Sequence, residues 1–136
     1  MENRLIAVDT DVIIDFFSNI SPATEVLSEL ISCREAVMTS VSVFELHAGI
    51  EGKRRLSQVE TLIRNVMVVP LDVIEAAMAG KICTQLKSEG QLIGTQDILI
   101  AGVCLANSLP LYTKNVSHFS RIQGLRIVPA GEIVQP

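Results

Sequence analysis

The sequence predicts a three-layer α/β/α sandwich built around a mainly parallel sheet. Short apolar runs of strand length alternate along the chain with longer segments of helical spacing, a pattern typical of helices that cover both faces of a parallel sheet. Hydrophobic residues make up 49% of the 136 residues, but aromatic residues only 4%, and Trp is absent. The core is therefore expected to consist of Val, Ile, Leu and Ala, as buried parallel strands do. No repeat, linker or low-complexity stretch interrupts this pattern, so residues 1–136 are predicted to form one domain.

The first half of the chain begins with a continuous apolar run at residues 5–8, which predicts a central parallel strand. Residues 10–17 have helical spacing. Ser21 and Pro22 predict the N-cap and first turn of a second helix that extends to about Cys33, because Ser favours the N-cap and Pro the first helical position. The remaining elements predicted in this half are a strand at 36–39 and helices at 41–49 and 53–64.

The second half begins with a predicted strand at residues 66–70, which ends before Asp72. Asp72 is a favourable N-cap for the helix that follows, which runs to about Ser88 and stops at Gly90. The remaining predictions are a polar loop at 91–96, a very apolar helix at 97–107, a fourth strand at 110–113 and a short fifth strand at 126–128.

Composition excludes several classes of protein. A net charge of −4 and a pI of about 5.1 argue against a protein that coats nucleic acid by bulk electrostatics. They do not exclude a nuclease, because carboxylates that hold metal lower the net charge themselves. The sequence shows neither a signal peptide nor an apolar run of about 18 residues, so no membrane association is expected. Cys33, Cys83 and Cys104 are widely spaced, which predicts buried thiols of a cytoplasmic protein rather than disulfides or zinc ligands.

Basic and other charged residues outside the apolar stretches are expected at the surface. Asp15 is predicted to be solvated or paired on its own helix, and His118 to be exposed. The basic residues for which the same solvated position is predicted are Lys53, Arg54, Arg55, Lys114, Arg121 and Arg126.

Three acidic residues lie in apolar surroundings far apart in the chain: Asp9, Glu45 and Asp97. An unpaired charge in such surroundings is costly, and a shared cation offsets that cost. We therefore expect one site for Mg²⁺ or Mn²⁺, both of which prefer oxygen ligands. Asp9 and Asp97 are predicted as direct ligands, and Glu45 either completes the cage or holds a water. Helix N-capping would explain Asp9 or Asp97 singly, but all three acids together favour metal chemistry.

The predicted fold brings polar residues to the same place. Ligands of parallel α/β sheets collect outside the carboxyl ends of the strands. Asp9 and Asp11 follow the first predicted strand, Thr39 follows the second, and Thr113 and Asn115 follow the fourth. Asn115 lacks the charge to bind a cation strongly and is expected to orient a water or a ligand. With a phosphodiester substrate, such a cluster would activate water for in-line attack.

Four short segments, at residues 8–15, 39–49, 94–101 and 111–119, resemble the PIN-domain proteins of the VapC toxin type in order and spacing. The resemblance covers nearly the whole chain. It implies an α/β/α sandwich and an Mg²⁺- or Mn²⁺-dependent endoribonuclease. It also implies a homodimer and a toxin held inactive by a cognate antitoxin, which would lay an apolar helix into a groove beside the site and place an Arg among the acids. For a dimer surface the sequence itself offers only Val26, Leu27, Leu30 and Ile31, which are equally consistent with core.

The resemblance also assigns roles to individual residues. The invariant acids of the family fall on Asp9, Glu45 and Asp97. A fourth position, often Asp in the family, is Asn115 here, which favours one held metal ion and a second recruited with the substrate. The supporting residues are then Asp11, where the family often has Asn, and the three threonines expected to orient ligands by hydrogen bonds, Thr10, Thr39 and Thr113.

Two alternatives stay open from the sequence. Asp9 and Asp11 also match the D-x-D signature of haloacid-dehalogenase-type phosphatases, with Asp9 as the nucleophile and Asp11 as its acid/base partner. That alternative leaves Glu45 without a role and the chain with little room for a cap. The second alternative is a catalytically weak PIN scaffold, which Asn115 alone supports. The phosphatase alternative would use Thr39 or Ser40 and Lys81 or Lys87 for phosphate, and Asp97 for Mg²⁺.

Overall fold

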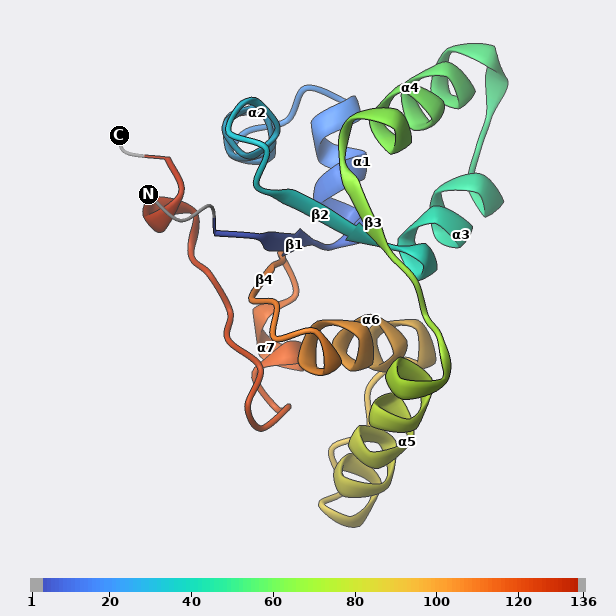
Figure 1. The fold of residues 1–136 in the computed structure, drawn as a ribbon, viewed down its shortest axis with the longest axis vertical. Helices are drawn as coiled ribbons and strands as arrows, with labels where there is room; N and C mark the ends of the chain where they lie inside the picture. The colour runs from blue at the N-terminus through green and yellow to red at the C-terminus, as the bar shows by residue number, and fades with distance from the viewer. Residues whose placement is uncertain (1–3, 135–136) are drawn as a thin grey trace.

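A four-stranded parallel sheet forms the centre of the computed structural model, which describes residues 4–134 (Figure 1). Its order is β3-β2-β1-β4, and each strand pairs in parallel with its neighbours. The parallel α/β class predicted from the sequence is confirmed. The strands are β1 (Ile6–Val8), β2 (Ala36–Thr39), β3 (Met67–Val69) and β4 (Leu111–Tyr112).

Helices cover both faces of the sheet. In Figure 1, α1, α2 and α4 lie on one side of the strands, and α5, α6 and α7 lie on the other. The helices of the first half are α1 (Thr10–Phe17), α2 (Ala23–Ser32), α3 (Ser40–Ala48) and α4 (Gly52–Asn65). Those of the second half are α5 (Val73–Ser88), α6 (Thr95–Ala106), α7 (Val116–Phe119) and the short 3-10 helix η1 (Ala130–Glu132).

Alternation along the strands produces two cores, one on each face. Ile6 and Val8 of β1 join a buried cluster with the apolar residues of α1, α2 and α4, whereas Ala7 joins the cluster around α5 and α6. This follows from the two-residue period of a strand. Val26, Leu27 and Leu30 of α2 are buried in the first cluster, so they are core residues and are not available for a dimer surface.

Helices α2, α6 and α7 differ from the sequence prediction in ways that matter for the argument. Helix α2 begins at Ala23 with Pro22 as its N-cap, because Ser21 Oγ donates to Glu25 Oε1 (2.6 Å) instead of capping the backbone. Helix α6 begins at Thr95, two residues earlier than predicted, and α7 was not predicted.

The fifth strand predicted at residues 126–128 is reduced to a single bridge. Leu111 pairs in parallel with Ile127 and with no further residue of that segment in the described part of the chain. The reason lies in the length of β4. It is only two residues long, and the carbonyl of its second residue, Tyr112, accepts a hydrogen bond from the Asp9 backbone N–H on the β1 side (3.0 Å), so Leu111 is the residue of β4 that faces this segment.

The structure tests the prediction made for the three cysteines. All three cysteines are free thiols in the described residues, as predicted, but only Cys104 is buried, whereas Cys83 is half-buried and Cys33 is exposed. The prediction of three buried thiols was therefore wrong for Cys33, which follows the end of α2 at the surface.

Within residues 4–134, every helix is too short or too polar to span a bilayer.

Candidate active site

Asp9 is the central acid of the site. It follows β1 and is the N-cap of α1, where its Oδ1 accepts a hydrogen bond from the Thr10 backbone N–H (2.8 Å). Its Oδ2 accepts a hydrogen bond from the hydroxyl of Thr113 (2.8 Å). Thr113 is the residue that follows β4. Only 4% of Asp9 is exposed. The carboxylate therefore caps a helix and at the same time connects the carboxyl ends of two neighbouring strands.

Glu45 reaches the same region from α3. Thr10 Oγ1 donates a hydrogen bond to Glu45 Oε1 (2.7 Å) and lies 2.8 Å from Ser42 Oγ. Because the Thr10 hydroxyl has one proton and gives it to Glu45, Ser42 donates to Thr10. Thr39, the N-cap of α3, accepts a hydrogen bond from the Ser42 backbone N–H (3.2 Å). Thr39 thus orients the helix that carries Glu45, rather than contacting an acid directly.

Asp97 lies in the first turn of α6, three residues after the N-cap Gly94. It is therefore not the N-cap, which removes the capping explanation for this acid. Asn115 Nδ2 donates to Asp97 Oδ2 (3.2 Å) and lies 2.8 Å from His118 Nδ1. The Asn115 backbone N–H donates to Thr113 Oγ1 (2.9 Å), the same hydroxyl that bonds Asp9.

A continuous path of hydrogen bonds, made by side chains and by two backbone N–H groups, therefore joins the three predicted acids across segments far apart in the sequence. Thr10 links Glu45 to Asp9, and Thr113 and Asn115 link Asp9 to Asp97. Asp11 is exposed beside this path, and its charge helps to raise the pKa values of both Asp9 and Asp97. All of the predicted site residues thus belong to one neighbourhood at the carboxyl ends of the strands.

Sequence reasoning missed three participants in this neighbourhood. Ser42 is fully buried against Thr10, and its spacing of three residues before Glu45 on one helix was the available signal. His118, expected at the surface, contacts Asn115. Asp15 was expected to be solvated or paired on its own helix, but its Oδ2 forms an ion pair with Lys114 Nζ (2.7 Å). No sequence pattern signalled the last two contacts.

Burial and mutual repulsion set the electrostatics of the acids. Burial raises the pKa of Asp9 to about 6, against the lowering effect of its hydrogen bonds from Thr113 and Thr10, and the charges of Asp97 and Asp11 raise it further. Burial also raises the pKa of Asp97, while the hydrogen bond from Asn115 and the nearby His118 lower it. Folding therefore disfavours the charged forms of two acids in one place, a cost that a bound cation would relieve.

The donor set fits a hard divalent cation. The acids offer only oxygen atoms, which suit Mg²⁺ and Mn²⁺, and Mg²⁺ takes one or two protein carboxylates and keeps several waters. Within residues 4–134, no group of three or more His, Cys, Asp or Glu side chains is arranged to hold a metal ion, so the acids do not form a closed cage. Asp9 and Asp97 with water suit such a cation best. The assignment of Asp9, Asp97 and Glu45 as ligands stays a prediction.

The raised pKa of Asp9 predicts a pH-dependent stability of the metal-free protein. Because the folded pKa is about 6 and the ordinary value 3.8, folding favours the neutral carboxyl. The stability due to Asp9 is full below pH 3.8 and is lost as the pH rises through about 6. Relative to Asp9→Asn, wild-type protein should lose up to about 3 kcal/mol of unfolding free energy across this interval. Urea unfolding in EDTA measures the difference, and a constant difference between pH 4 and pH 7 would contradict it.

The chain is similar to known proteins in sequence and in fold. The family profile described as "PIN domain" matches residues 6–125. "Ribonuclease VapC1" of Methanocaldococcus jannaschii is 33% identical over 129 residues, which covers 93% of this chain and 88% of that protein. "tRNA(fMet)-specific endonuclease VapC" of Shigella flexneri is 31% identical over 93 residues, with 65% of this chain and 70% of that protein covered. The DNA-bound VapBC structure from Salmonella typhimurium has a TM-score of 0.83 at 28% identity and covers 93% of this chain and 98% of that one.

Proposed function

Since the chain belongs to the PIN domain family, among its VapC-type ribonucleases, we propose that it hydrolyses RNA phosphodiester bonds with Mg²⁺ or Mn²⁺ at the site around Asp9. The observation that carries this proposal is the hydrogen-bonded path from Glu45 through Asp9 to Asp97. It connects the three acids in one neighbourhood at the strand ends, where ligands of parallel sheets bind. As proposed, residues 1–136 act as one nuclease domain and as the toxin of a toxin–antitoxin pair.

Each side chain then has a defined task. Asp9 and Asp97 would hold the cation, and the Thr10 backbone N–H and the Thr113 hydroxyl keep the Asp9 carboxylate in a fixed orientation. Glu45 would orient the attacking water through the carboxylate oxygen that Thr10 does not contact. When bound, the cation supplies polarisation of the phosphoryl oxygens and activation of water.

The phosphatase alternative is wrong. It assigned Glu45 no role, whereas Glu45 is bonded into the site through Thr10. It assigned Thr39 to phosphate, whereas the Thr39 hydroxyl caps α3. The family match points the same way, because it covers residues 6–125 with a PIN domain.

Cleavage of single-stranded RNA tests the proposal directly. Purified protein should cleave a fluorescently labelled single-stranded RNA with Mg²⁺ or Mn²⁺, stop in EDTA, and resume when excess Mg²⁺ is added. p-Nitrophenyl phosphate should not turn over. Asp97→Asn protein purified in parallel controls for contaminating ribonuclease. Folded protein that binds metal but cleaves none of a varied set of RNAs would leave the scaffold alternative standing.

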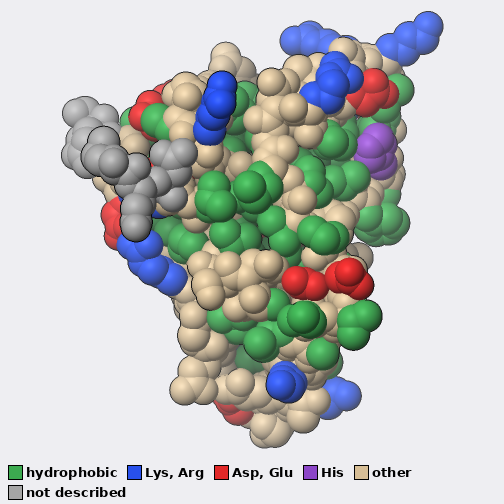
Figure 2. All heavy atoms as spheres, viewed as in Figure 1, with side chains coloured by type: hydrophobic (Ala, Val, Ile, Leu, Met, Phe, Trp, Pro, Cys, Tyr) green, Lys and Arg blue, Asp and Glu red, His purple; other side chains and the backbone are tan. Residues whose placement is uncertain are grey.

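A groove between α1, α2 and α4 supports an antitoxin partner. One structural neighbour of this chain is a toxin–antitoxin complex from Klebsiella pneumoniae, and another is a member of the VapBC family of toxin–antitoxin systems from Mycobacterium tuberculosis. In this protein a groove of about 530 Å³ is lined by Phe16, Phe17, Ile31 and Leu62 together with polar side chains of α4. On the face shown in Figure 2, hydrophobic side chains gather across the middle, at the level of the strands below α2 and α4 of Figure 1. We propose that an apolar helix of the antitoxin occupies this groove and directs an Arg to the acids, because guanidinium pairs with carboxylates bidentately.

Ile31→Arg tests the groove. Ile31 is half-buried in its wall, and a charge there should weaken inhibition by the protein encoded beside this gene by about ten-fold or more, the cost of placing a charge in an apolar contact. RNA cleavage by the variant alone should not change. The control is Leu92→Arg, an exposed position that does not line the groove. If the partner inhibits the Ile31 variant at the same concentration at which it inhibits the wild-type protein, the groove is excluded as the binding site of the antitoxin.

We also infer that two copies pair through the β3 edge of the sheet. Met67 of the edge strand β3 and Val73 and Ile74 at the start of α5 are large apolar side chains that are more than half exposed, as is Phe44 of α3. Contiguous exposed apolar residues are typical of subunit interfaces. A monomer mass by light scattering at micromolar concentration would contradict the dimer.

We also propose that the protein acts in the cytoplasm, because its proposed substrate is RNA. Detection of the protein in an exported fraction would contradict this location.

A further inference from the structure

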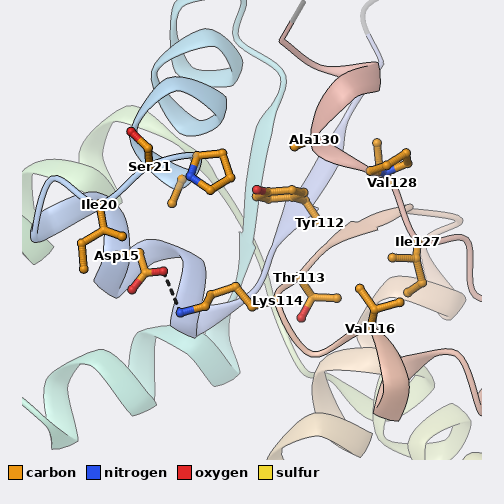
Figure 3. Close-up of a pocket in the computed structure, with 13 residues that line it drawn as sticks. Asp15, Ile20, Ser21, Tyr112, Thr113, Lys114, Val116, Ile127, Val128 and Ala130 are labelled. Carbon is orange, nitrogen blue, oxygen red and sulfur yellow. Dashed lines mark ion pairs between the residues drawn. The ribbon is translucent and has the colours of Figure 1, made fainter. Parts of the chain in front are cut away.

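A second cavity lies directly beside the proposed active site. It has a volume of about 720 Å³ and is bounded by the α1–α2 connection on one side and the segments that follow β4 on the other (Figure 3). Thr113 lines this cavity, and its hydroxyl donates to Asp9 Oδ2. A molecule bound in the cavity would therefore lie one side chain away from the carboxylate proposed to hold the metal.

The walls of the cavity are mainly apolar. Ile20 and Val116 stand on opposite sides of it in Figure 3, and each is 48% exposed, which leaves their aliphatic surfaces free for contact. In the view of Figure 3 the ring of Tyr112 lies between Ser21 and Val128, so it forms part of the wall. Volumes of about 300–1,000 Å³ with apolar walls and few polar groups are typical of sites for small organic molecules.

One cation stands at the edge of the cavity. Lys114 Nζ forms an ion pair with Asp15 Oδ2 (2.7 Å), and both residues line the cavity. The Lys114 side chain is 55% exposed, so the ammonium group remains open to a second anionic partner. The cavity thus combines apolar walls with a cation on the side that continues into the acid site.

We propose that this cavity, here called the base pocket, receives one unpaired nucleobase of the RNA next to the bond that is cut. Lys114 then contacts the neighbouring backbone phosphate. The inference rests on the proposed ribonuclease function. A flat base suits aliphatic and aromatic walls, since unpaired RNA bases are commonly splayed out and packed on such side chains. The adjacent cation and the shared Thr113 favour a nucleotide over an apolar peptide side chain, because a nucleotide must place a phosphate beside its base.

The chain provides its own reporter for this pocket. Tyr112 is the only tyrosine of the 136 residues, and there is no Trp. Protein labelled with ¹³C in the tyrosine ring therefore gives one ring spin system by NMR, and it reports on the wall of the base pocket. The titration uses the four ribonucleoside 5′-monophosphates in EDTA, with ribose 5-phosphate as the ligand that lacks a base. Saturable shifts of the Tyr112 ring with at least one nucleotide, and none with ribose 5-phosphate, are expected.

A matched pair of variants separates the pocket from general effects. Ile20→Trp fills the pocket and should weaken nucleotide binding about ten-fold, the effect of losing the contacts of one base, and it should shift the preferred cleavage positions in RNA. Leu92→Trp is the control, because Leu92 is exposed to a similar degree (50%) and does not line the pocket. The control should bind nucleotides and cut RNA like wild type.

Three results would overturn the base pocket. Equal shifts with ribose 5-phosphate would leave only a phosphate contact. Shifts that depend on protein concentration and not on nucleotide would indicate a second copy as the occupant. Unchanged nucleotide binding and an unchanged cleavage pattern in Ile20→Trp would exclude the pocket while the ribonuclease function stands. Failure of wild-type protein to cut any RNA concerns the proposed function alone, because the nucleotide titration is read without cleavage.

Discussion

Asp97→Asn is expected to abolish RNA cleavage and to stabilise the metal-free protein. Loss of one charged ligand removes several kcal/mol of interaction with the cation, so cleavage should fall about a thousand-fold or more. The stability gain follows from the raised pKa of Asp97, which burial causes and the charge of Asp11 increases. A neutral amide removes that unfavourable charge, and its oxygen can still accept the hydrogen bond from Asn115 Nδ2.

Cleavage of labelled RNA and thermal unfolding in EDTA measure the two effects. The control is Asp72→Asn, because Asp72 caps α5 and Asn caps a helix equally well, so activity and stability should stay near wild type. Cleavage retained by Asp97→Asn would remove Asp97 from the proposed ligands. A lower melting temperature of this variant in metal-free buffer would show that ionised Asp97 stabilises the fold, against the argument made from its burial.

Gly102→Ala is expected to destabilise the protein, although Ala favours helices over Gly by about 1 kcal/mol. Helices α5 and α6 pack closely at Gly102, where an added Cβ would lie 2.7 Å from Ala79 Cβ, 2.8 Å from Ala79 N and 2.9 Å from Ala79 Cα. Two of these atoms are backbone, so neither can move aside alone, and the helices must separate. Overpacking of this kind typically costs about 1–3 kcal/mol. Because α6 also carries Asp97, cleavage should fall as the helix shifts.

Gly80→Ala is the matched control for this contact. Gly80 follows Ala79 on α5, and a Cβ there would meet no heavy atom of the described residues within 4 Å beyond its own helix. The same substitution should therefore stabilise the protein by about 0.5–1 kcal/mol through helix propensity. Urea unfolding of both variants gives the two signs. A stabilising Gly102→Ala would show that α5 and α6 can separate at no cost.

Local patterns account for what could be predicted about the fold. The alternation of short apolar runs with helical spacing predicted the parallel α/β class, since periodicity reports which side of an element is buried. Asp72 was predicted as an N-cap, and it forms a capping box with Glu75. The fifth strand and the start of α2 were wrong because their outcome depended on which partners neighbouring polar groups took. The Tyr112 carbonyl accepts from the Asp9 backbone N–H, and the Ser21 hydroxyl donates to Glu25.

The sequence by itself determined the fold class and the three candidate acids. The period with which apolar residues recur, and the isolated charges within apolar stretches, are both visible in the local order of the residues. Only the tertiary structure decided how the acids are connected. Glu45 meets Asp9 through Thr10, and Asp97 joins through Asn115. These contacts join segments that are far apart in the chain. Only the tertiary structure decided two further contacts, the ion pair of Lys114 with Asp15 and the close approach of α5 and α6 at Gly102. Distances between packed elements depend on the whole core and leave no local pattern in the sequence.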